Sequence, residues 1–261
     1  DAMFTIFRPR RNGRQGTICK VYRSVGQLDA KVRNQEILAA IDRERSRFRT
    51  IKQDEDYWLH VNLSVFQSLT RRADGTKSPY EAAKDVHRRI TSDANLYVPD
   101  QTIVRLITWL RSHGVRIVIG SNQEEAPLRK LLKAHKIEGL FDAVHTSESL
   151  ETRKPYPDFW ERILAIEQQS IEQVVHLGNS PNSDIGAARL GIHTMLWDPS
   201  GRIKTVLASK KEFRLAHPDV DEREFSRLLR GKLVTPFSTF PQAEELLRCL
   251  SSPPPPPSVS P

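Results

Sequence analysis

The sequence has little cysteine and no long apolar run. Cys19 and Cys249 are the only cysteines in the 261 residues, and they stand near opposite ends. This excludes a disulfide-rich scaffold and a cysteine metal site, and two free thiols indicate a reducing compartment, the cytoplasm or the nucleus. No run of about 18 apolar residues occurs, so we expect no membrane span. No cleavable secretion signal is visible either.

Acidic residues are fewer than basic ones, which gives a net charge of +8. Such a charge would suit nucleic acid or an acidic surface. Most arginines and lysines alternate with glutamate and aspartate along predicted helices, so we interpret them as solvated faces and do not expect a nucleic-acid partner. The exception is residues 8–14, R-P-R-R-N-G-R. We predict that this segment is a basic loop that helps to attract an anionic substrate.

Two kinds of hydrophobic pattern divide the chain. Across residues 26–95, apolar side chains recur at spacings near three and four, including Ile37, Ile41, Val61, Val65 and Phe66. This spacing predicts several helices, with Trp58 and Phe66 in their core. Pro253–Pro257 forms a polyproline end that cannot pack a core, and we interpret it as solvated. The alternative is a ligand for a proline-recognising domain.

The second pattern is an alternation of short apolar runs with helical segments, which predicts a doubly wound parallel α/β sheet. The predicted strands are residues 115–119, 141–145, 174–177, 192–196 and 233–234, and the predicted helices are residues 99–113, 126–135, 157–167, 183–190 and 242–250. The charged stretch of residues 209–231 is expected to be an insertion or an extra helix.

Three loops that carry polar or charged side chains each follow one of these apolar runs. They carry Ser121 in V-I-G-S-N, Lys154 in R-K-P-Y-P-D, and Asp184 in G-N-S-P-N-S-D-I-G. Loops that leave the carboxyl ends of parallel strands converge on one crevice, so a hydroxyl, an ammonium and a carboxylate should meet there. This set suits an anionic ligand.

At these residues the chain resembles the haloacid dehalogenase-like (HAD) hydrolases, which use an aspartate nucleophile, a Ser or Thr, a Lys and acidic residues in this order. The resemblance is greatest to the branch around haloacid dehalogenase-like hydrolase domain-containing protein 3. It implies a Rossmann-like α/β core of residues 1–16 and 96–250 and a helical cap of residues 17–95. Residues 251–261, which contain the polyproline run, are expected from their composition to be a disordered tail.

The family's first motif is matched by Asp1-Ala2-Met3-Phe4-Thr5-Ile6. By position Asp1 would be the nucleophile, while Met3 stands where phosphatases of the family carry the general acid. Phe4 replaces the usual glycine. The apolar strand that should precede this motif is not in the sequence, so we expect that the first strand of the core is missing.

The resemblance implies that Lys154 neutralises the nucleophile and the phosphoryl group, and that Ser121 and Asn122 bind substrate oxygens. Mg²⁺ would be held by Asp1, Asp184 and Asn179, the last a neutral residue where an acidic one is often found. Plainer interpretations remain open: Ser121 and Asn122 as a helix cap, Lys154 as a surface lysine, and residues 179–184 as a helix N-terminal loop in which Gly186 serves packing.

The preferred function is a HAD-like hydrolase that acts on a small phosphorylated compound through an aspartyl-phosphate intermediate, impaired by Met3. The alternative is a catalytically inactive HAD-fold binding protein. A 2-haloacid dehalogenase ranks below both, because Phe4 stands in place of glycine. The histidines, His176 among them, show no ligand spacing and are interpreted as surface or satisfied core residues.

Overall fold

The computed structural model describes residues 6–9, 13–25, 28, 31–47, 55–69, 78–208, 221–230 and 233–251. The chain divides into two compact units. Unit 1 comprises Asp1–Ile6, Pro99–Glu125 and Gly139–Pro261, and unit 2 comprises Phe7–Val98 and Ala126–Glu138. The predicted cap, residues 17–95, falls within unit 2, which also takes in residues 126–138. The predicted nucleophile Asp1, with Met3 and Phe4, lies outside the described residues, as does the polyproline segment.

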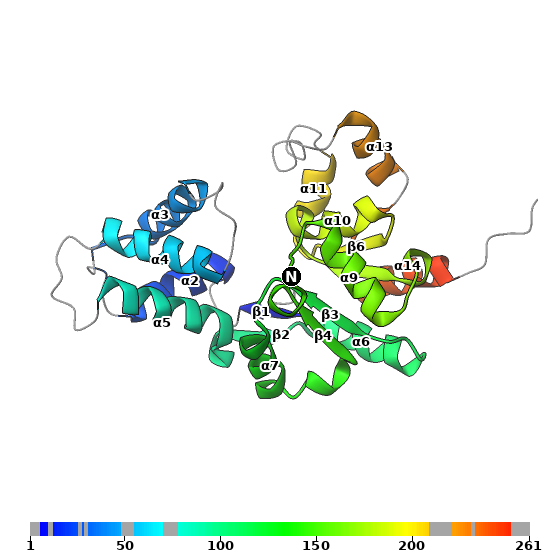
Figure 1. Ribbon diagram of the computed structural model, residues 1–261, viewed down its shortest axis with the longest axis horizontal. Coiled ribbons are helices and arrows are strands. Elements are labelled where there is room, and N and C mark those ends of the chain that lie inside the picture. Colours follow the sequence, from blue (N-terminus) through cyan, green and yellow to red (C-terminus); the bar gives the residue numbers. More distant parts are fainter. Residues whose placement is uncertain are drawn as a thin grey trace, which may run out of the picture. The chain divides into compact units, whose positions relative to one another are not determined.

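Unit 2 is mainly helical (Figure 1). Its described elements are the paired strands β1 (Phe7–Pro9) and β2 (Tyr97–Pro99), and the helices α2 (Gly13–Ser24), α3 (Asn34–Arg47), α4 (Glu55–Leu69), α5 (Pro79–Ser92), η1 (Ala94–Leu96) and α7 (Glu125–Ala134). The start of α5 shows how local sequence sets a boundary. The Ser78 hydroxyl accepts a hydrogen bond from the Glu81 N–H, and the Glu81 carboxylate accepts one from the Ser78 N–H. This capping box satisfies two backbone donors at the helix terminus.

Two expectations about unit 2 need correction. The basic segment of residues 8–14 is not a continuous loop, because Arg8 and Pro9 lie in β1 and α2 begins at Gly13. Trp58 is 40% exposed, whereas Val61, Val65 and Phe66 are fully buried. Trp58 follows buried Tyr57 by one position, about 100° around the helix, so it lies at the edge of the apolar stripe and packs edge-on against the Tyr57 ring.

Unit 1 alternates strands and helices along the chain (Figure 1). Its described elements are α6 (Gln101–Ser112), β3 (Val118–Ser121), η2 (Glu138–Leu140), β4 (Ala143–Thr146), α8 (Ser147–Leu150), α9 (Pro157–Glu167), η3 (Ile171–Gln173), β5 (Val175–Gly178), α10 (Pro181–Leu190), β6 (His193–Trp197), α11 (Arg202–Ala208), α13 (Glu222–Arg230), β7 (Val234–Phe237) and α14 (Phe240–Ser251).

All strand pairs of unit 1 for which the register is resolved are parallel. β3 pairs with β4, with Ser121 opposite Thr146, and β6 lies between β5 and β7, with Gly178 opposite Leu196. The predicted α/β fold with a parallel sheet is therefore confirmed. The described strands make up two separate sheets, β3-β4 and β5-β6-β7.

Strand boundaries shift by a few residues from the prediction, and the hydrogen bonding explains one shift. The predicted strand of residues 115–119 is found at Val118–Ser121. Ahead of it, the Ile117 N–H donates to the Asp142 side chain and the Ile117 carbonyl accepts from the Asp142 N–H. Because the Asp142 carboxylate accepts the Ile117 N–H, the regular backbone pairing of β3 begins only at Val118. Within the segment of residues 209–231, α13 is described and residues 209–220 are not.

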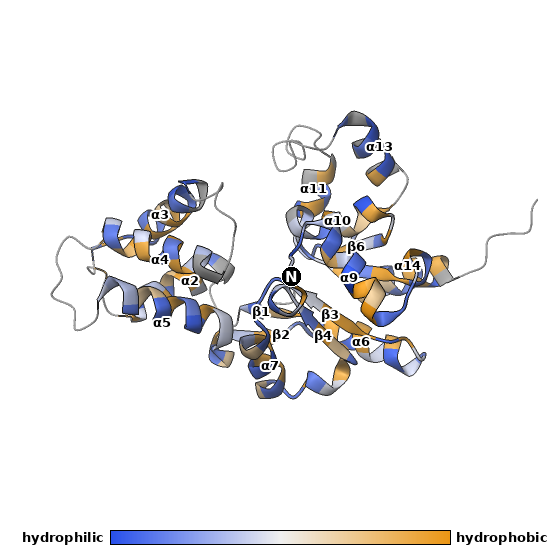
Figure 2. Cartoon of the chain, viewed as in Figure 1, coloured by the Kyte–Doolittle hydropathy of each residue, from blue (hydrophilic) through white to orange (hydrophobic). Residues whose placement is uncertain are grey.

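The helices of both units are amphipathic. Figure 2 shows hydrophobic and hydrophilic residues alternating around α4, α9 and α14. In unit 1, one apolar cluster joins α9 to α10, through the buried side chains Leu150, Phe159, Trp160, Ala187 and Ile192. This cluster lies directly behind the loops predicted to carry the site. Within the described residues, no helix combines the length and apolarity needed to cross a membrane.

Candidate active site

The described residues of the predicted site lie at a strand end, in a loop and at a helix start. Ser121 is the last residue of β3, Lys154 lies in the loop between α8 and α9, and Asp184 is in the first turn of α10. All are buried: Ser121 and Asp184 have no exposed surface and Lys154 is 2% exposed. The interpretation of Lys154 as a surface lysine is therefore wrong. Ser121 and Asp184 are 63 positions apart in the sequence, and folding brings them to the same part of unit 1.

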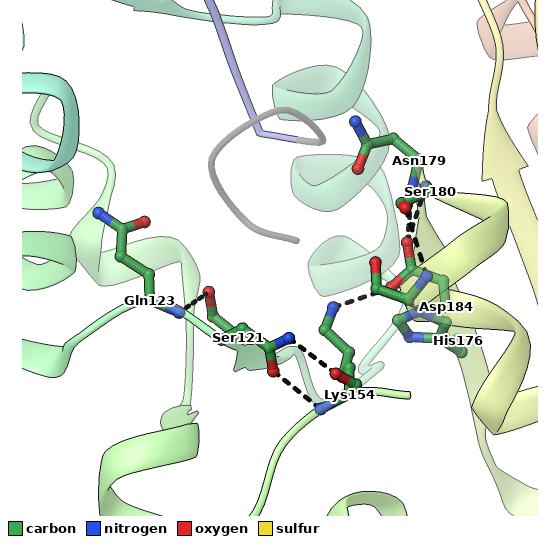
Figure 3. A network of polar contacts seen from close by, with 9 residues as sticks. Ser121, Gln123, Lys154, His176, Asn179, Ser180 and Asp184 are labelled. Carbon is green, nitrogen blue, oxygen red and sulfur yellow. Dashed lines mark hydrogen bonds and ion pairs between the residues drawn. The ribbon is translucent and has the colours of Figure 1, made fainter. Parts of the chain in front are cut away.

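Lys154 and Asp184 form a fully buried ion pair. The Lys154 Nζ donates to Asp184 Oδ1 over 2.8 Å, and neither side chain is exposed (Figure 3). Oδ1 also receives a hydrogen bond from His176 Nε2 over 3.0 Å. Oδ2 accepts from the backbone N–H groups of Asn179 and Ser180, at 3.0 and 2.9 Å. A carboxylate offers about four acceptor positions, so these donors satisfy Asp184.

The charges of the pair follow from this environment. Burial by itself would raise the pKa of Asp184, but the Lys154 ammonium and the His176 hydrogen bond hold that pKa well below its usual range. Burial lowers the pKa of His176 to about 4, and its hydrogen bond to Asp184 offsets only part of that effect. Around neutral pH Asp184 is thus a carboxylate and His176 a neutral imidazole.

Asn122 ties two of the loops together. Its side-chain amide donates to the Lys154 carbonyl over 2.9 Å, and its side-chain oxygen accepts from the Lys154 N–H over 2.8 Å. The Ser121 hydroxyl accepts from the Gln123 N–H over 3.1 Å, which is a local turn contact. Asn122 thus holds two loops together and Ser121 stabilises its own turn, and the substrate-binding role of both stays a prediction.

Sequence reasoning misses the side chains that surround the ion pair. The sequence pattern indicates only a surface or core residue at His176, but this side chain contacts Asp184 directly. Trp160 packs against it with ring centroids 4.3 Å apart, and the Lys154 Nζ lies 5.5 Å from the Trp160 ring centroid. A signal for His176 exists. It precedes Gly178 by two positions on β5, and in a strand alternate residues share a face.

Two glycines permit this close packing. A Cβ on Gly178 would lie 2.3 Å from Asp184 Oδ2, and one on Gly186 would lie 2.2 Å from the Pro155 carbonyl oxygen. Both distances are far inside van der Waals contact. Gly178 leaves room for the carboxylate, and Gly186 lets α10 approach the chain next to Lys154, so its place in packing is supported.

Of the predicted magnesium ligands, Asp1 lies outside the described residues, and Asp184 and Asn179 do not by themselves form a magnesium cage. Asp184 has its acceptor positions filled by protein donors. The Asn179 side chain points away from Asp184 in Figure 3, and its contribution is a backbone N–H. No group of three or more His, Cys, Asp or Glu side chains placed to hold a metal occurs within the part of the chain that the structure describes. Mg²⁺ prefers several oxygen ligands, and Asp184 could join them only by giving up a present donor.

A groove of about 470 Å³ lies elsewhere, in unit 2, where the end of α5 and α7 come together. It is lined by Arg88, Arg89, Ser92, Asp93, Ala94, Asn95, Lys130 and Ala134. Its arginines are already engaged, since Arg88 donates to Asp85 and Arg89 to Ser24. None of the described residues of the predicted site lines this groove.

A parallel α/β core with a serine, a lysine and an aspartate on successive loops is the arrangement of a HAD-type hydrolase. The family model of haloacid dehalogenase-like hydrolases matches residues 15–191. The chain belongs to this family. Its residues are 33% identical over 146 positions to haloacid dehalogenase-like hydrolase domain-containing protein 3 of Xenopus laevis, covering 55% of this chain and 57% of that protein. The chain thus matches little more than half the length of this relative.

Solved structures of the same fold are similar at low identity. The HAD hydrolase YfnB of Bacillus subtilis, described as bound to magnesium, has a TM-score of 0.61 at 15% identity, over 90% of this chain and 92% of that one. L-2-haloacid dehalogenase from Xanthobacter autotrophicus has a TM-score of 0.60 at 13% identity, over 95% and 96%. A HAD family hydrolase from Deinococcus radiodurans, described with bound phosphate and sodium, has a TM-score of 0.56 at 16% identity, over 95% and 93%.

Proposed function

We propose that this chain hydrolyses a small phosphorylated compound, with Asp1 as nucleophile and Lys154 as the fixed positive charge of the site. The observation that carries the proposal is the fully buried Lys154 ammonium, held 2.8 Å from Asp184 at the loops that follow the strands. A buried lysine is costly unless it is paired, and an ammonium beside a carboxylate nucleophile offsets the repulsion between two anions.

In this reaction a carboxylate oxygen of Asp1 forms a bond to phosphorus, and the bond from phosphorus to the alcohol oxygen breaks. Water then attacks the phosphorus of the aspartyl-phosphate, the bond from phosphorus to the Asp1 oxygen breaks, and a proton from the water passes to solvent. Inorganic phosphate leaves and the Asp1 carboxylate is restored. Met3 has no proton to give to the leaving oxygen, so solvent must supply it. General acid catalysis typically contributes about 10²- to 10⁴-fold, and the chain is accordingly proposed to be a slow enzyme.

Lys154 would act in both steps, because the negative charge on the phosphoryl oxygens persists from substrate to intermediate. Ser121 would add a hydroxyl donor after a rotation away from the Gln123 N–H, and Asn122 holds the Lys154 backbone in place. Mg²⁺, when bound, would supply further positive charge at the phosphoryl group. The present hydrogen bonds of Asp184 argue that such binding is weak.

The test is a screen of the full chain against generic phosphomonoesters and 2-haloacids, each with Mg²⁺ and with a chelator. We expect slow release of phosphate, abolished in Lys154→Met. Lys154→Met keeps most of the side-chain length and removes the charge. Release of halide in the chelator, without phosphatase activity, would favour the dehalogenase. Phosphate release that Lys154→Met leaves unchanged would contradict the assignment.

A catalytically inactive binding protein is the second candidate. It is favoured by the four protein donors that already bond to the Asp184 carboxylate. With no acceptor position left over and no general acid at Met3, the same loops would bind a phosphate group without turning it over. Calorimetric binding of inorganic phosphate, lost in Lys154→Met and accompanied by no turnover of any ester, would support this candidate over the enzyme.

A further inference from the structure

We propose that His176 is the positioning residue of this site: by donating its Nε2 proton to Asp184 Oδ1, it fixes the carboxylate to which the Lys154 ammonium is bound. The effect of His176 on ligand binding rests on the proposed function, whereas its effect on Lys154 does not. No residue pattern assigns His176 such a part, and the proposal comes from the contacts around Asp184.

The first argument is that the two oxygens of the Asp184 carboxylate accept hydrogen bonds from different kinds of donor. Oδ2 is held by two backbone N–H groups of the loop that starts α10, so its position follows from the fold. Oδ1 receives two side-chain donors, Lys154 Nζ at 2.8 Å and His176 Nε2 at 3.0 Å. Of these two, the lysine is long and flexible, and the imidazole is short and comes from a strand. The imidazole therefore sets where Oδ1 lies.

The second argument is that the imidazole is itself held. His176 belongs to β5, which is paired with β6 through the His176–Thr194 register. Its ring lies against the Trp160 ring, 4.3 Å between centroids, and Trp160 is 5% exposed in the core of α9 and α10. The ring can thus keep its Nε2 directed at Asp184 without support from solvent.

The third argument is the consequence for Lys154. The Lys154 Nζ lies over the Trp160 ring at 5.5 Å from its centroid, so the ammonium contacts both Asp184 and Trp160. If His176 no longer holds Oδ1, the carboxylate can turn about its remaining bonds, and the ammonium loses a fixed partner. We therefore expect that loss of the His176 Nε2–H donor changes the reactivity of Lys154 as well as the stability of the fold.

The experiment compares two substitutions in the full chain. His176→Phe keeps an aromatic ring against Trp160 and removes the donor, whereas His176→Gln loses the ring and keeps an amide N–H near the Nε2 position. Acetylation of Lys154 by acetic anhydride is measured by peptide mass mapping, with exposed Lys204 as the internal control. Inorganic phosphate is titrated by calorimetry, and the free energy of unfolding is measured by urea for all proteins.

We expect His176→Phe to raise acetylation of Lys154 roughly tenfold, equivalent to about 1.4 kcal/mol, and to weaken phosphate binding by a similar factor. Lys204 should be unaffected, and His176→Gln should stay close to the wild type in both measurements. The proposal is overturned if His176→Phe leaves Lys154 protected, or if both variants expose it equally, since packing and not the donor would then matter. Failure of the wild type to bind phosphate would count against the proposed function alone.

A spectroscopic measurement on the wild-type chain covers the case in which His176→Phe does not fold. With ¹⁵N-labelled histidine, the His176 signals should show the Nε2–H tautomer with a slowly exchanging proton. In Asp184→Asn that proton should shift and exchange faster. A wild-type His176 with the proton on Nδ1 would overturn the proposal, because no donor would then face Asp184.

Discussion

The Lys154 Nζ lies 2.8 Å from Asp184 Oδ1, and neither side chain has any exposed surface. The two residues stand on different loops, 30 positions apart. Burial makes each charge dependent on the other, because neither can be hydrated. This mutual dependence is the source of several measurable consequences.

Asp184→Asn should lower the free energy of unfolding by about 3–5 kcal/mol, because it leaves the Lys154 charge buried without its partner. Urea unfolding at neutral pH measures the change. The matched control is Asp85→Asn, which breaks the exposed pair with Arg88 and should cost less than about 1 kcal/mol. Equal effects of the two substitutions would contradict the account of a buried pair.

Gly186→Ala should destabilise the fold by at least about 1–3 kcal/mol, since the added Cβ would lie 2.2 Å from the Pro155 carbonyl oxygen. The same substitution at Gly139, where a Cβ would meet nothing within 4 Å, should be neutral or slightly stabilising. Thermal unfolding of both variants checks the prediction. A Gly186→Ala protein as stable as the wild type would show that α10 can move away from Pro155.

The free energy of unfolding should depend on pH in a way set by the protonation of His176. Its pKa is about 4 in the folded chain against an ordinary 6.5, so between these values the unfolded chain binds a proton that the folded chain does not. Stability should therefore rise with pH from about 4 to 6.5, by at most about 1.4 kcal/mol per pH unit from this residue, and gain nothing more from it at higher pH.

The measurement is the urea midpoint as a function of pH for the wild type and His176→Gln. The two curves should diverge below pH 6.5 and run parallel above it. Asp184 does not disturb this window, because its lowered pKa places its own loss of stability at still lower pH. Curves that stay parallel from pH 4 to 7 would rule out a buried, neutral His176.

Met3→Asp should raise phosphomonoester hydrolysis, within the roughly 10²- to 10⁴-fold range of general acid catalysis. The prediction rests on the first motif alone, since Met3 lies outside the described residues. Met3→Asn is the control, because it has the size and polarity of Asp but cannot deliver the proton. The enzyme proposal loses its support if a folded Met3→Asp protein is no faster, and the binding protein then becomes the better account.

The order of the elements, and the loops that meet at one edge of the sheet, can be predicted from the amino-acid sequence. The spacing of apolar residues records which face of an element is buried, and the carboxyl ends of parallel strands share an edge. For that reason the residue pattern alone groups Ser121, Lys154 and Asp184 into one site. The three-to-four spacing likewise predicts the buried Ile37, Val61 and Val65 of unit 2.

What these side chains touch becomes visible in the folded structure. The imidazole of His176 on Asp184 and the Asn122 amide on the Lys154 backbone both depend on the distances between elements. Periodicity carries the direction of a side chain but not those distances, which are set by how closely the backbones pack. Gly186 is an example: α10 can approach Pro155 because residue 186 has no side chain, and the sequence alone does not show that Pro155 is the residue that lies against it.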